Sequence, residues 1–195
     1  MCNEYEQEIK FANLQKLMEQ LNLQLPAGQG PADLRTAADI RIGEKGPVVR
    51  AAGNGVEIAH MTFGFPPPKP KRPRVFNFIS EKRDFSKSQR CGILASAFFE
   101  FTGSKYPKAK HRFTLAGEPF LFVAGLWRNG DDGDSFTMLT TAPGQDIAPY
   151  HDRQIVVLKP QDLPHWLYLS KPQSELLQPL APGTLTHELV RGGSD

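Results

Sequence analysis

Residues 90–101 read RCGILASAFFEF, and within them Ile93–Phe101 is a run rich in apolar and aromatic side chains. Similar runs follow at 120–127, 135–141 and 154–158, each bounded by glycine, proline or aspartate. Short runs of strand-favouring residues with such ends are typical of buried strands joined by loops. The core of the protein is therefore expected to consist of β-strands.

The segments before and after these runs predict the rest of the fold. Residues 48–52 and 56–63 flank a Gly53-Asn54-Gly55 turn, which predicts a β-hairpin. Apolar side chains recur at helical spacing between residues 10 and 22, and short helical turns are expected at 161–167 and 174–177. No internal repeat or long linker interrupts the chain. We therefore expect one β-rich α+β domain over residues 1–195.

Composition narrows the class of protein. No run of 18 apolar residues is present, which argues against a membrane-spanning helix. The first six residues are polar and acidic, unlike a secretory signal, so we expect a cytoplasmic protein. The two cysteines, Cys2 and Cys91, are expected to be free thiols, with Cys91 in the core. Because the histidines lack metal-ligand spacing and no phosphate-binding loop motif occurs, we expect no metal and no cofactor.

The positive charge is concentrated in two segments, although the formal net charge is only +2. Residues 69–90 contain eight basic and two acidic side chains, and residues 105–112 add four basic ones. The remainder of the chain carries a net charge of −8. A basic stripe on an acidic body is typical of a surface that binds a polyanion, but a solvated basic loop is an equally good interpretation. The proline-rich tract 66–74 is expected to run extended on the surface and to present its cations.

Cys2 is the residue with the most distinctive chemistry. Removal of Met1 would leave an α-amine and a thiol on adjacent carbons, and both groups titrate near neutral pH. Such a pair suits aldehydes, because the amine forms an imine and the thiol then closes a thiazolidine ring. The alternative is a cysteine that occupies position 2 by accident.

Three polar residues stand beside apolar runs and are candidates to support this chemistry: Asn77, Glu100 and His151. Glu100 lies between Phe99 and Phe101, where desolvation would raise the pKa of its carboxyl and suit it to proton transfer. His151 has the side chain that most readily transfers a proton near pH 7. A strand-edge carboxylate facing water and a surface-loop histidine remain open as alternatives.

Together these segments resemble the SOS-response-associated peptidase (SRAP) family. Residues 77–81 stand in the place of its Asn-Ala-Arg-x-Glu motif, and residues 90–101 in the place of Arg-Cys-Leu-Ile-Pro-Ala-Asp-Gly-Phe-Tyr-Glu-Trp. The other matching segments, in the family's order, are Met1-Cys2, 63–67, 124–127, 140–142 and 151–153. The resemblance extends over essentially the whole chain.

The resemblance implies a mostly antiparallel, barrel-like core with a few flanking helices, in a monomer. It also implies that the protein binds single-stranded DNA with abasic sites and crosslinks to them through mature Cys2. The same site would remove Met1, and AP-lyase chemistry could accompany the crosslink. Asn77 would orient the Cys2 amine, while Glu100 and His151 would transfer protons. No membrane is implied as a partner, and the cytoplasmic protein would join the nucleoid when bound to damaged DNA.

DNA contacts are expected from the basic residues and from two apolar side chains. Phe63 and Pro67 would wedge against exposed bases. The candidates to hold phosphates are Lys69, Lys71, Arg72, Arg74, Arg90 and Arg153.

Three positions depart from the family pattern. Glu4 stands in place of a phosphate-binding cation, Ile79 in place of an arginine and Phe63 in place of a tryptophan. We therefore expect DNA contacts to shift toward residues 66–74. A noncatalytic single-strand-binding module, and a cysteine peptidase that pairs Cys2 with His151, are the competing interpretations.

Overall fold

The computed structural model describes residues 2–35, 38–67, 69 and 71–195. Its elements in chain order are β1 (Glu4–Glu6), α1 (Phe11–Gln20), η1 (Pro31–Leu34), β2 (Asp39–Arg41), β3 (Lys45–Ala52), β4 (Gly55–Phe63), β5 (Asn77–Ile79), β6 (Arg90–Ala95), β7 (Ala97–Thr102), β8 (Ala109–Leu115), β9 (Leu121–Arg128), β10 (Ser135–Thr141), β11 (Gln154–Ile155), β12 (Val157–Leu158), η2 (Pro160–Asp162), α2 (Leu163–Tyr168), α3 (Gln173–Leu176) and β13 (Leu185–Arg191).

Five strands close into a ring, which confirms the barrel-like core. Strand β3 pairs with β4 and β6, β6 with β9, and β10 with both β9 and β4. The β10–β4 and β10–β5 pairs are parallel, and the remaining pairs of strands are antiparallel among the residues described. The short strands β5 and β11 pair with β10, and β12 pairs with β9. A closed ring leaves few unpaired strand edges, so the barrel strands hold the ends of the connecting loops in fixed positions.

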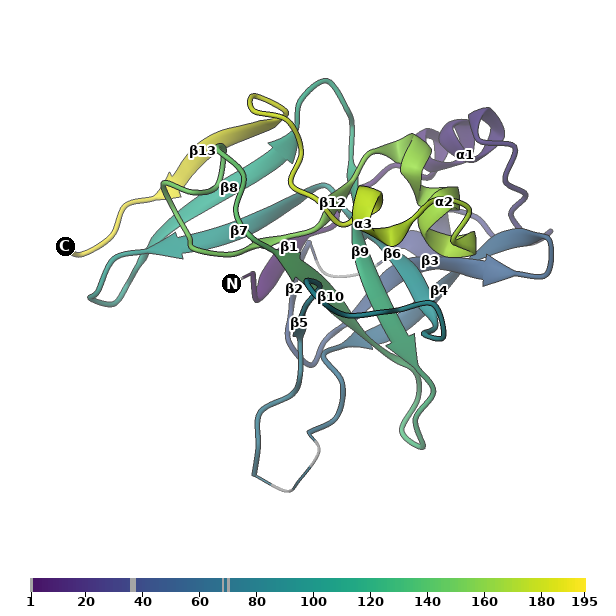
Figure 1. Ribbon diagram of the computed structural model, residues 1–195, viewed down its shortest axis with the longest axis horizontal. Coiled ribbons are helices and arrows are strands. Elements are labelled where there is room, and N and C mark those ends of the chain that lie inside the picture. The colour runs from purple at the N-terminus through teal and green to yellow at the C-terminus, as the bar shows by residue number, and fades with distance from the viewer. Residues whose placement is uncertain (1, 36–37, 68, 70) are drawn as a thin grey trace.

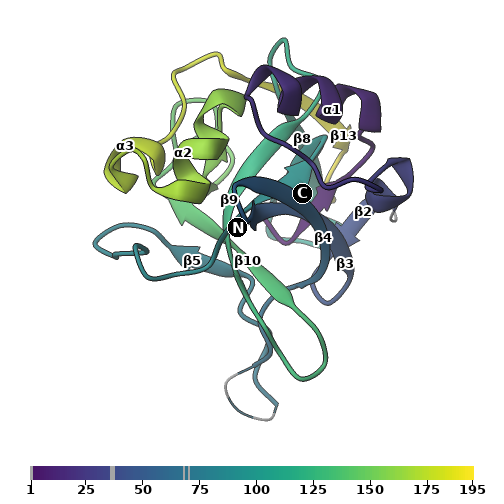
Figure 2. The same ribbon diagram turned by 90° about the vertical axis from the view of Figure 1, so that its right-hand side faces the viewer.

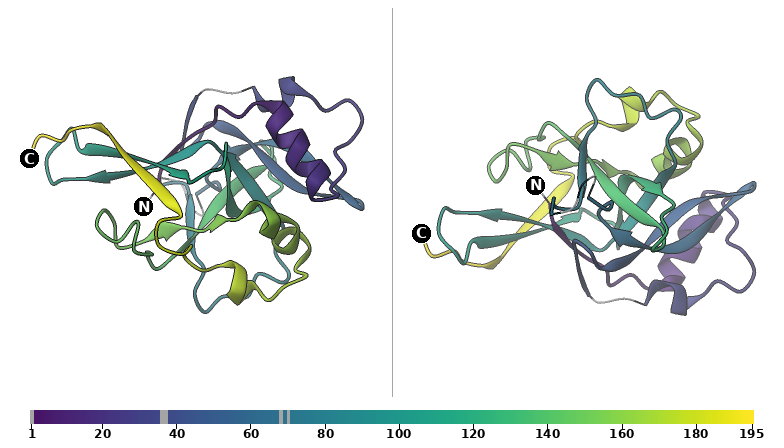
Figure 3. Two further views of the ribbon diagram at one scale, coloured as in Figure 1. Left: turned by 90° about the horizontal axis from the view of Figure 1, so that it is seen from above. Right: turned by 90° about the horizontal axis from the view of Figure 1, so that it is seen from below.

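A second sheet extends from the barrel in the order β13-β8-β7-β1-β2. Strands β7 and β8 form a long hairpin that projects from the body of the molecule, with β13 beside β8 (Figures 1 and 3). Strand β1 lies between β7 and β2, so the start of the chain is held on both sides. The N-terminal segment therefore lies where the hairpin joins the barrel.

Alternate residues of the barrel strands face two different cores. Val48 and Ile93 belong to the cluster inside the barrel, whereas their neighbours Val49 and Leu94 pack in a cluster beneath the helices. Helices α1, α2 and α3 lie on one side of the barrel (Figure 2). Because both faces of these strands are buried, their sequences read as continuous apolar runs.

The helices and the first hairpin confirm their predictions. Helix α1 lies within the expected 10–22, β3 and β4 form the hairpin around the Gly53-Asn54 turn, and α2 and α3 lie near the two expected helical turns. Among the described helices, none combines the length and apolar character that a membrane span requires. Cys91 is a buried free thiol, as expected.

Two apolar runs are split, which corrects the expectation of one strand each. The run Ile93–Phe101 bends at Ser96 and supplies β6 to the barrel and β7 to the second sheet. The Ser96 backbone N–H donates to the Glu6 carbonyl, and its hydroxyl donates to the Glu6 carboxylate at 2.7 Å. These bonds to β1 replace the ladder bonds that a straight strand would make. The run 154–158 is likewise divided at Val156 into β11 and β12.

The tract 66–74 leaves the barrel and returns to it, so it is not one continuous extended segment, which corrects a further expectation. Phe65 and Val75 form an antiparallel bridge with reciprocal bonds of 2.9 and 3.1 Å, so the tract leaves and returns as a loop. Lys71 adopts a positive φ of 65° within it. The loop projects from the lower end of the barrel in Figure 1. Pro68 and Pro70 lie outside the described residues.

Candidate active site

Cys2 is completely buried at the edge of the barrel core, where β1 fixes its position. Tyr5 pairs with Ile40 on one side and with Phe98 on the other, which anchors the segment three residues after Cys2. The thiol donates to the Glu4 carbonyl over 3.2 Å. Burial, followed by the charge of Glu100, raises the pKa of the thiol to about 12. The sulfur is therefore protonated at neutral pH and needs a neighbouring base before it can attack.

Asn77 holds the backbone of Cys2 by a hydrogen bond from β5. Strand β5 pairs in parallel with β10, where Asn77 faces Met138 across the ladder. The Asn77 Nδ2 donates to the Cys2 carbonyl over 3.3 Å. Its Oδ1 is buried and has no hydrogen-bond partner among the described residues. A buried acceptor in this state is suited to a donor that approaches Cys2.

Glu100 lies on β7 with no exposed surface, which excludes a strand-edge carboxylate facing water. Burial raises the pKa of its carboxyl to about 7. The direction of the shift confirms the sequence expectation. At neutral pH both protonation states of Glu100 are populated, so it can accept or donate a proton.

His151 follows a helical turn in which its backbone N–H donates to the Ile147 carbonyl over 3.0 Å. Its Nδ1 lies 3.0 Å from the Arg153 backbone nitrogen and 2.7 Å from Asp152 Oδ1. Unprotonated Nδ1 accepts from the first, and protonated Nδ1 donates to the second, so the ring is held in either state. Burial lowers the pKa of His151, which favours the neutral imidazole at pH 7.

A pocket of about 670 Å³ brings Glu100 and His151 together at the junction of the hairpin and the barrel. Its other lining residues are Asn3, Glu4, Arg41, Phe101, Tyr106, Lys108, Lys110 and Arg191. Asn77 contacts Cys2, and Cys2 adjoins Glu100, so the four predicted chemical residues form one connected group. Within the described part of the chain, no cluster of three or more His, Cys, Asp or Glu residues could bind a metal ion.

Sequence reasoning missed the role of Glu4 at this pocket. Its carboxylate lies 2.6 Å from the Lys110 ammonium and 3.5 Å from the Arg41 guanidinium. The Lys110 ammonium also lies 3.6 Å from the centre of the Phe99 ring. Glu4 therefore holds two cations at the pocket. The signal was the cluster of lysines at 105–112, but pairing across 106 positions is not readable from the sequence.

Phe63 was expected to wedge against DNA bases, and the structure shows that this is wrong. Strand β4 directs its ring into the barrel, where it is fully buried. The ring stacks on Phe136 with centroids 5.2 Å apart and meets Tyr5 edge-on at 5.7 Å. A side chain enclosed in this way presents no face to a base.

Arg90 stabilises the fold and does not extend toward a ligand. Its half-buried guanidinium donates to backbone carbonyls on two segments, the loop before β6 and helix α2. The five acceptors are the carbonyl oxygens of Phe85, Ser86, Ser88, Trp166 and Leu167, at 2.8–3.2 Å. The structure therefore corrects its assignment as a phosphate-binding residue.

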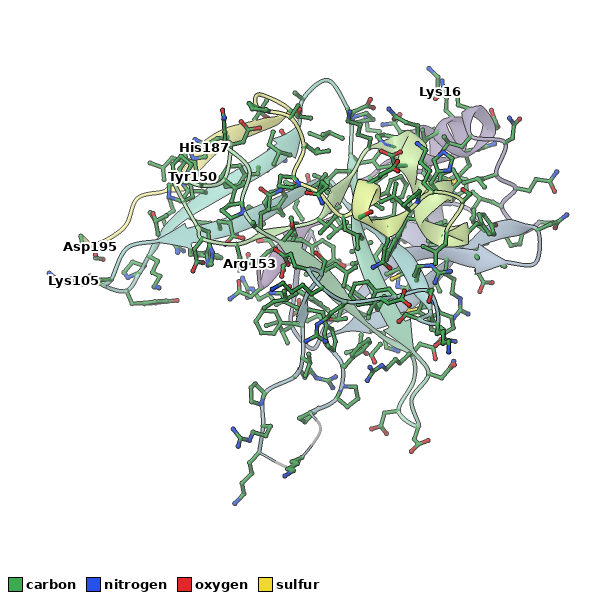
Figure 4. All side chains as sticks on the ribbon, in the orientation of Figure 1. Lys16, Lys105, Tyr150, Arg153, His187 and Asp195 are labelled. Carbon is green, nitrogen blue, oxygen red and sulfur yellow. The ribbon has the colours of Figure 1, made fainter. Side chains whose placement is uncertain are left out.

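The other predicted phosphate-binding residues differ in their freedom. Lys71 and Arg72 are exposed, whereas Arg74 donates to the Gly64 carbonyl over 2.9 Å at the base of the loop. Arg153, labelled in Figure 4, makes a two-pronged ion pair with Glu81 at 2.7 Å, and its hydrogen bonding lowers the pKa of that carboxyl to about 2.

Lys69 is also exposed, and Pro67 is partly buried. The exposed cations of residues 66–74 are therefore concentrated at Lys69, Lys71 and Arg72.

Comparison with known proteins gives consistent matches. Residues 1–191 match the family model described as SOS response associated peptidase (SRAP). The abasic site processing protein YoqW of Bacillus subtilis (strain 168) is 26% identical over 190 residues, which cover 87% of this chain and 83% of YoqW. The protein of the same name from Bacillus phage SPbeta matches to the same extent.

Solved structures share the fold. The X-ray structure of a protein from Bordetella bronchiseptica has a TM-score of 0.72 at 23% identity and covers 97% of this chain and 100% of its own. A protein from Bacteroides thetaiotaomicron has a TM-score of 0.74 at 17% identity, with coverages of 97% and 92%.

Proposed function

The chain belongs to the SOS response associated peptidase family, and from this premise we propose that it processes abasic sites in DNA by covalent attachment through Cys2. The substrate is single-stranded DNA in which a lost base leaves a sugar whose ring-opened form is an aldehyde. The protein acts as a monomer after Met1 has been removed at the same site.

The first step joins the Cys2 α-amine to the aldehyde carbon. The nitrogen attacks the carbonyl carbon, proton transfer gives a carbinolamine, and loss of one water molecule leaves an imine. Glu100, with a pKa of about 7, takes a proton from the amine and returns one to the departing hydroxyl. Asn77 holds the amine through its buried Oδ1, which has no partner among the described residues.

The second step closes the ring. The Cys2 sulfur attacks the imine carbon, the C=N pair of electrons moves to nitrogen, and the thiol proton is transferred to that nitrogen. Because burial raises the pKa of the thiol to about 12, this proton requires an acceptor, and Glu100 or neutral His151 provides one. The product is a thiazolidine that links protein and sugar. If a base instead removes a proton from the carbon next to the imine, the C–H electrons form a C=C bond, the phosphate leaves the β-carbon, and an AP-lyase reaction results.

The observation that carries this proposal is the position of the fully buried Glu100 carboxyl beside the equally buried Cys2, where its charge raises the pKa of the thiol. The Cys2 nitrogen becomes the α-amine when Met1 leaves, so a proton-transfer group lies beside the future nucleophile. A general cysteine peptidase, in contrast, needs a thiolate stabilised by imidazole. The protonated, buried thiol opposes that alternative.

The exposed cations of residues 66–74 supply phosphate contacts on one side of the site. Lys71 and Arg72 contact the DNA backbone, and Arg74 fixes the base of the loop. The charge of Arg153 is neutralised by Glu81, which also fixes the position of its guanidinium for a hydrogen bond to the DNA. Pro67 packs against the strand. This arrangement moves DNA contacts away from positions 4 and 79, where the usual cations are absent.

The test is adduct formation with single-stranded DNA that carries one abasic site. We expect a heat-stable band of reduced mobility on a denaturing gel for the wild-type protein and none for Cys2→Ala. Cys2→Ser keeps the amine, so it should form only an imine that borohydride traps. Mass spectrometry of the N-terminus should find Met1 absent.

The same experiment separates the alternatives. DNA binding without an adduct would support a noncatalytic module, and DNA-independent cleavage of unrelated peptides would support a cysteine peptidase.

A further inference from the structure

We infer that the tip of the β7–β8 hairpin is a second nucleotide-binding arm, in which Tyr106 stacks on a base and Lys105 and Lys108 bind backbone phosphates. This inference rests on the proposed function, because it places DNA at the same pocket. It assigns a role to a segment that the chemistry of Cys2 does not use.

Tyr106 is the most exposed large side chain at the pocket, with 89% of its surface accessible. It follows Lys105 in the chain, and Lys108 comes two residues later. An exposed aromatic ring next to lysines is the usual platform for an unpaired base, because every base has a face that can stack. The same pocket contains Glu100 and His151.

The cations of the arm remain available for phosphates. Glu4 neutralises Lys110 deeper in the pocket, but no carboxylate lies within ion-pair distance of Lys105 or Lys108 among the described residues. Lys108 lines the same pocket as Glu100 and His151, so it lies on the side of the arm that faces the chemical residues. Arg191 on β13 donates to the Lys108 carbonyl over 2.9 Å and adds a further positive charge.

The C-terminal segment holds the arm in shape. The Asp195 carboxylate accepts hydrogen bonds from the backbone N–H and hydroxyl of Ser104, at 2.6 and 2.7 Å. The Ser194 N–H donates to the Pro107 carbonyl over 3.1 Å. Figure 4 shows Lys105 and Asp195 side by side at this end of the molecule. A tip that is ordered before DNA arrives loses less conformational entropy on binding.

The arm and the 66–74 loop project in different directions, with the N-terminal segment between them (Figure 1). A strand that contacts both would cross the pocket with its abasic position over Cys2. Each element would then contact nucleotides on only one side of that position.

Fluorescence anisotropy with labelled single-stranded oligonucleotides tests the arm. Tyr106→Leu should weaken binding by about 5- to 150-fold, the range expected for loss of one stacked base, and Tyr106→Phe should keep the wild-type affinity. Lys108→Gln should reduce the slope of log Kd against log salt by about 0.7. Lys16→Gln, on helix α1 far from the hairpin, is the matched control and should leave the slope unchanged (Figure 4).

Oligonucleotides with flanking nucleotides only 5′ or only 3′ of the abasic position show which flank the arm contacts. The Tyr106→Leu effect should appear with one flank and vanish with the other. If Tyr106→Leu binds with wild-type affinity and Lys108→Gln leaves the salt slope unchanged, the hairpin tip does not bind DNA and the inference is wrong. Adduct formation by the wild-type protein is measured in parallel, and its absence would refute the proposed function whatever the two variants do.

Discussion

Replacing Glu100 with glutamine should slow adduct formation and should raise the stability of the protein at alkaline pH. The carboxyl has no exposed surface, and burial raises its pKa from 4.5 to about 7. The folded protein therefore binds a proton that the unfolded chain releases over this range. The free energy of unfolding contributed by Glu100 is fully present below pH 4.5 and is lost as pH rises through 7.

The size of this effect follows from the shift. A difference of about 2.5 pKa units corresponds to about 3 kcal/mol, because one unit is worth about 1.4 kcal/mol. The glutamine of the Glu100→Gln variant cannot ionise. The free energy of unfolding of this variant should therefore not fall as pH rises through 7. Relative to wild type, the variant should gain up to about 3 kcal/mol between pH 4.5 and pH 8. Adduct formation should slow by about 10²- to 10⁴-fold, the usual contribution of acid–base catalysis.

Urea denaturation at a series of pH values measures the first effect, and the rate of adduct formation measures the second. Glu8→Gln, which alters an exposed carboxylate, is the matched control and should follow the wild-type curve. If the stabilities of wild type and Glu100→Gln run parallel from pH 4.5 to 8, the carboxyl is not desolvated and the reasoning fails.

Three further variants test other parts of the site. Asn77→Ala removes the hydrogen bond to the Cys2 carbonyl and should slow adduct formation about tenfold at saturating DNA; an unchanged rate would remove Asn77 from the site. Ile79→Arg places a cation on a side chain that is 51% exposed, and should steepen the salt dependence of single-strand binding by about 0.7; equal slopes would show that no phosphate passes there. Arg90→Met leaves five carbonyls without their donor and should lower the free energy of unfolding by about 2–4 kcal/mol in urea titrations, whereas a loss of DNA affinity alone would return Arg90 to the binding surface.

Local patterns predicted those elements whose cause is local. The apolar spacing of α1 and the Gly53-Asn54 turn each specify a structure within a few residues, and both are confirmed. The split at Ser96 was not predictable, because it depends on hydrogen bonds to Glu6, 90 positions earlier. The short strands β1, β2 and β5 were also missed, since three residues carry too little periodicity to be recognised.

The candidate site shows the same division. An acidic residue among phenylalanines was enough to predict the burial and raised pKa of Glu100. The sequence could not show that Phe63 faces the barrel interior, because alternation along β4 gives two faces and both carry apolar residues. Nor could it show that Arg90 is occupied by carbonyls, since backbone acceptors leave no trace in the sequence.

The placement of β1 has a consequence for the order in which the protein matures. Cys2 leaves the ribosome before the strands that bury it, and His151 follows about 150 residues later. At about 5–20 residues per second this leaves an interval of roughly 7–30 seconds. In the proposed function Met1 is removed at the assembled site, so this step must wait until β7 pairs with β1 and His151 has joined Glu100 in the pocket. On this proposal, the speed of translation and folding sets how soon each molecule acquires the α-amine of Cys2.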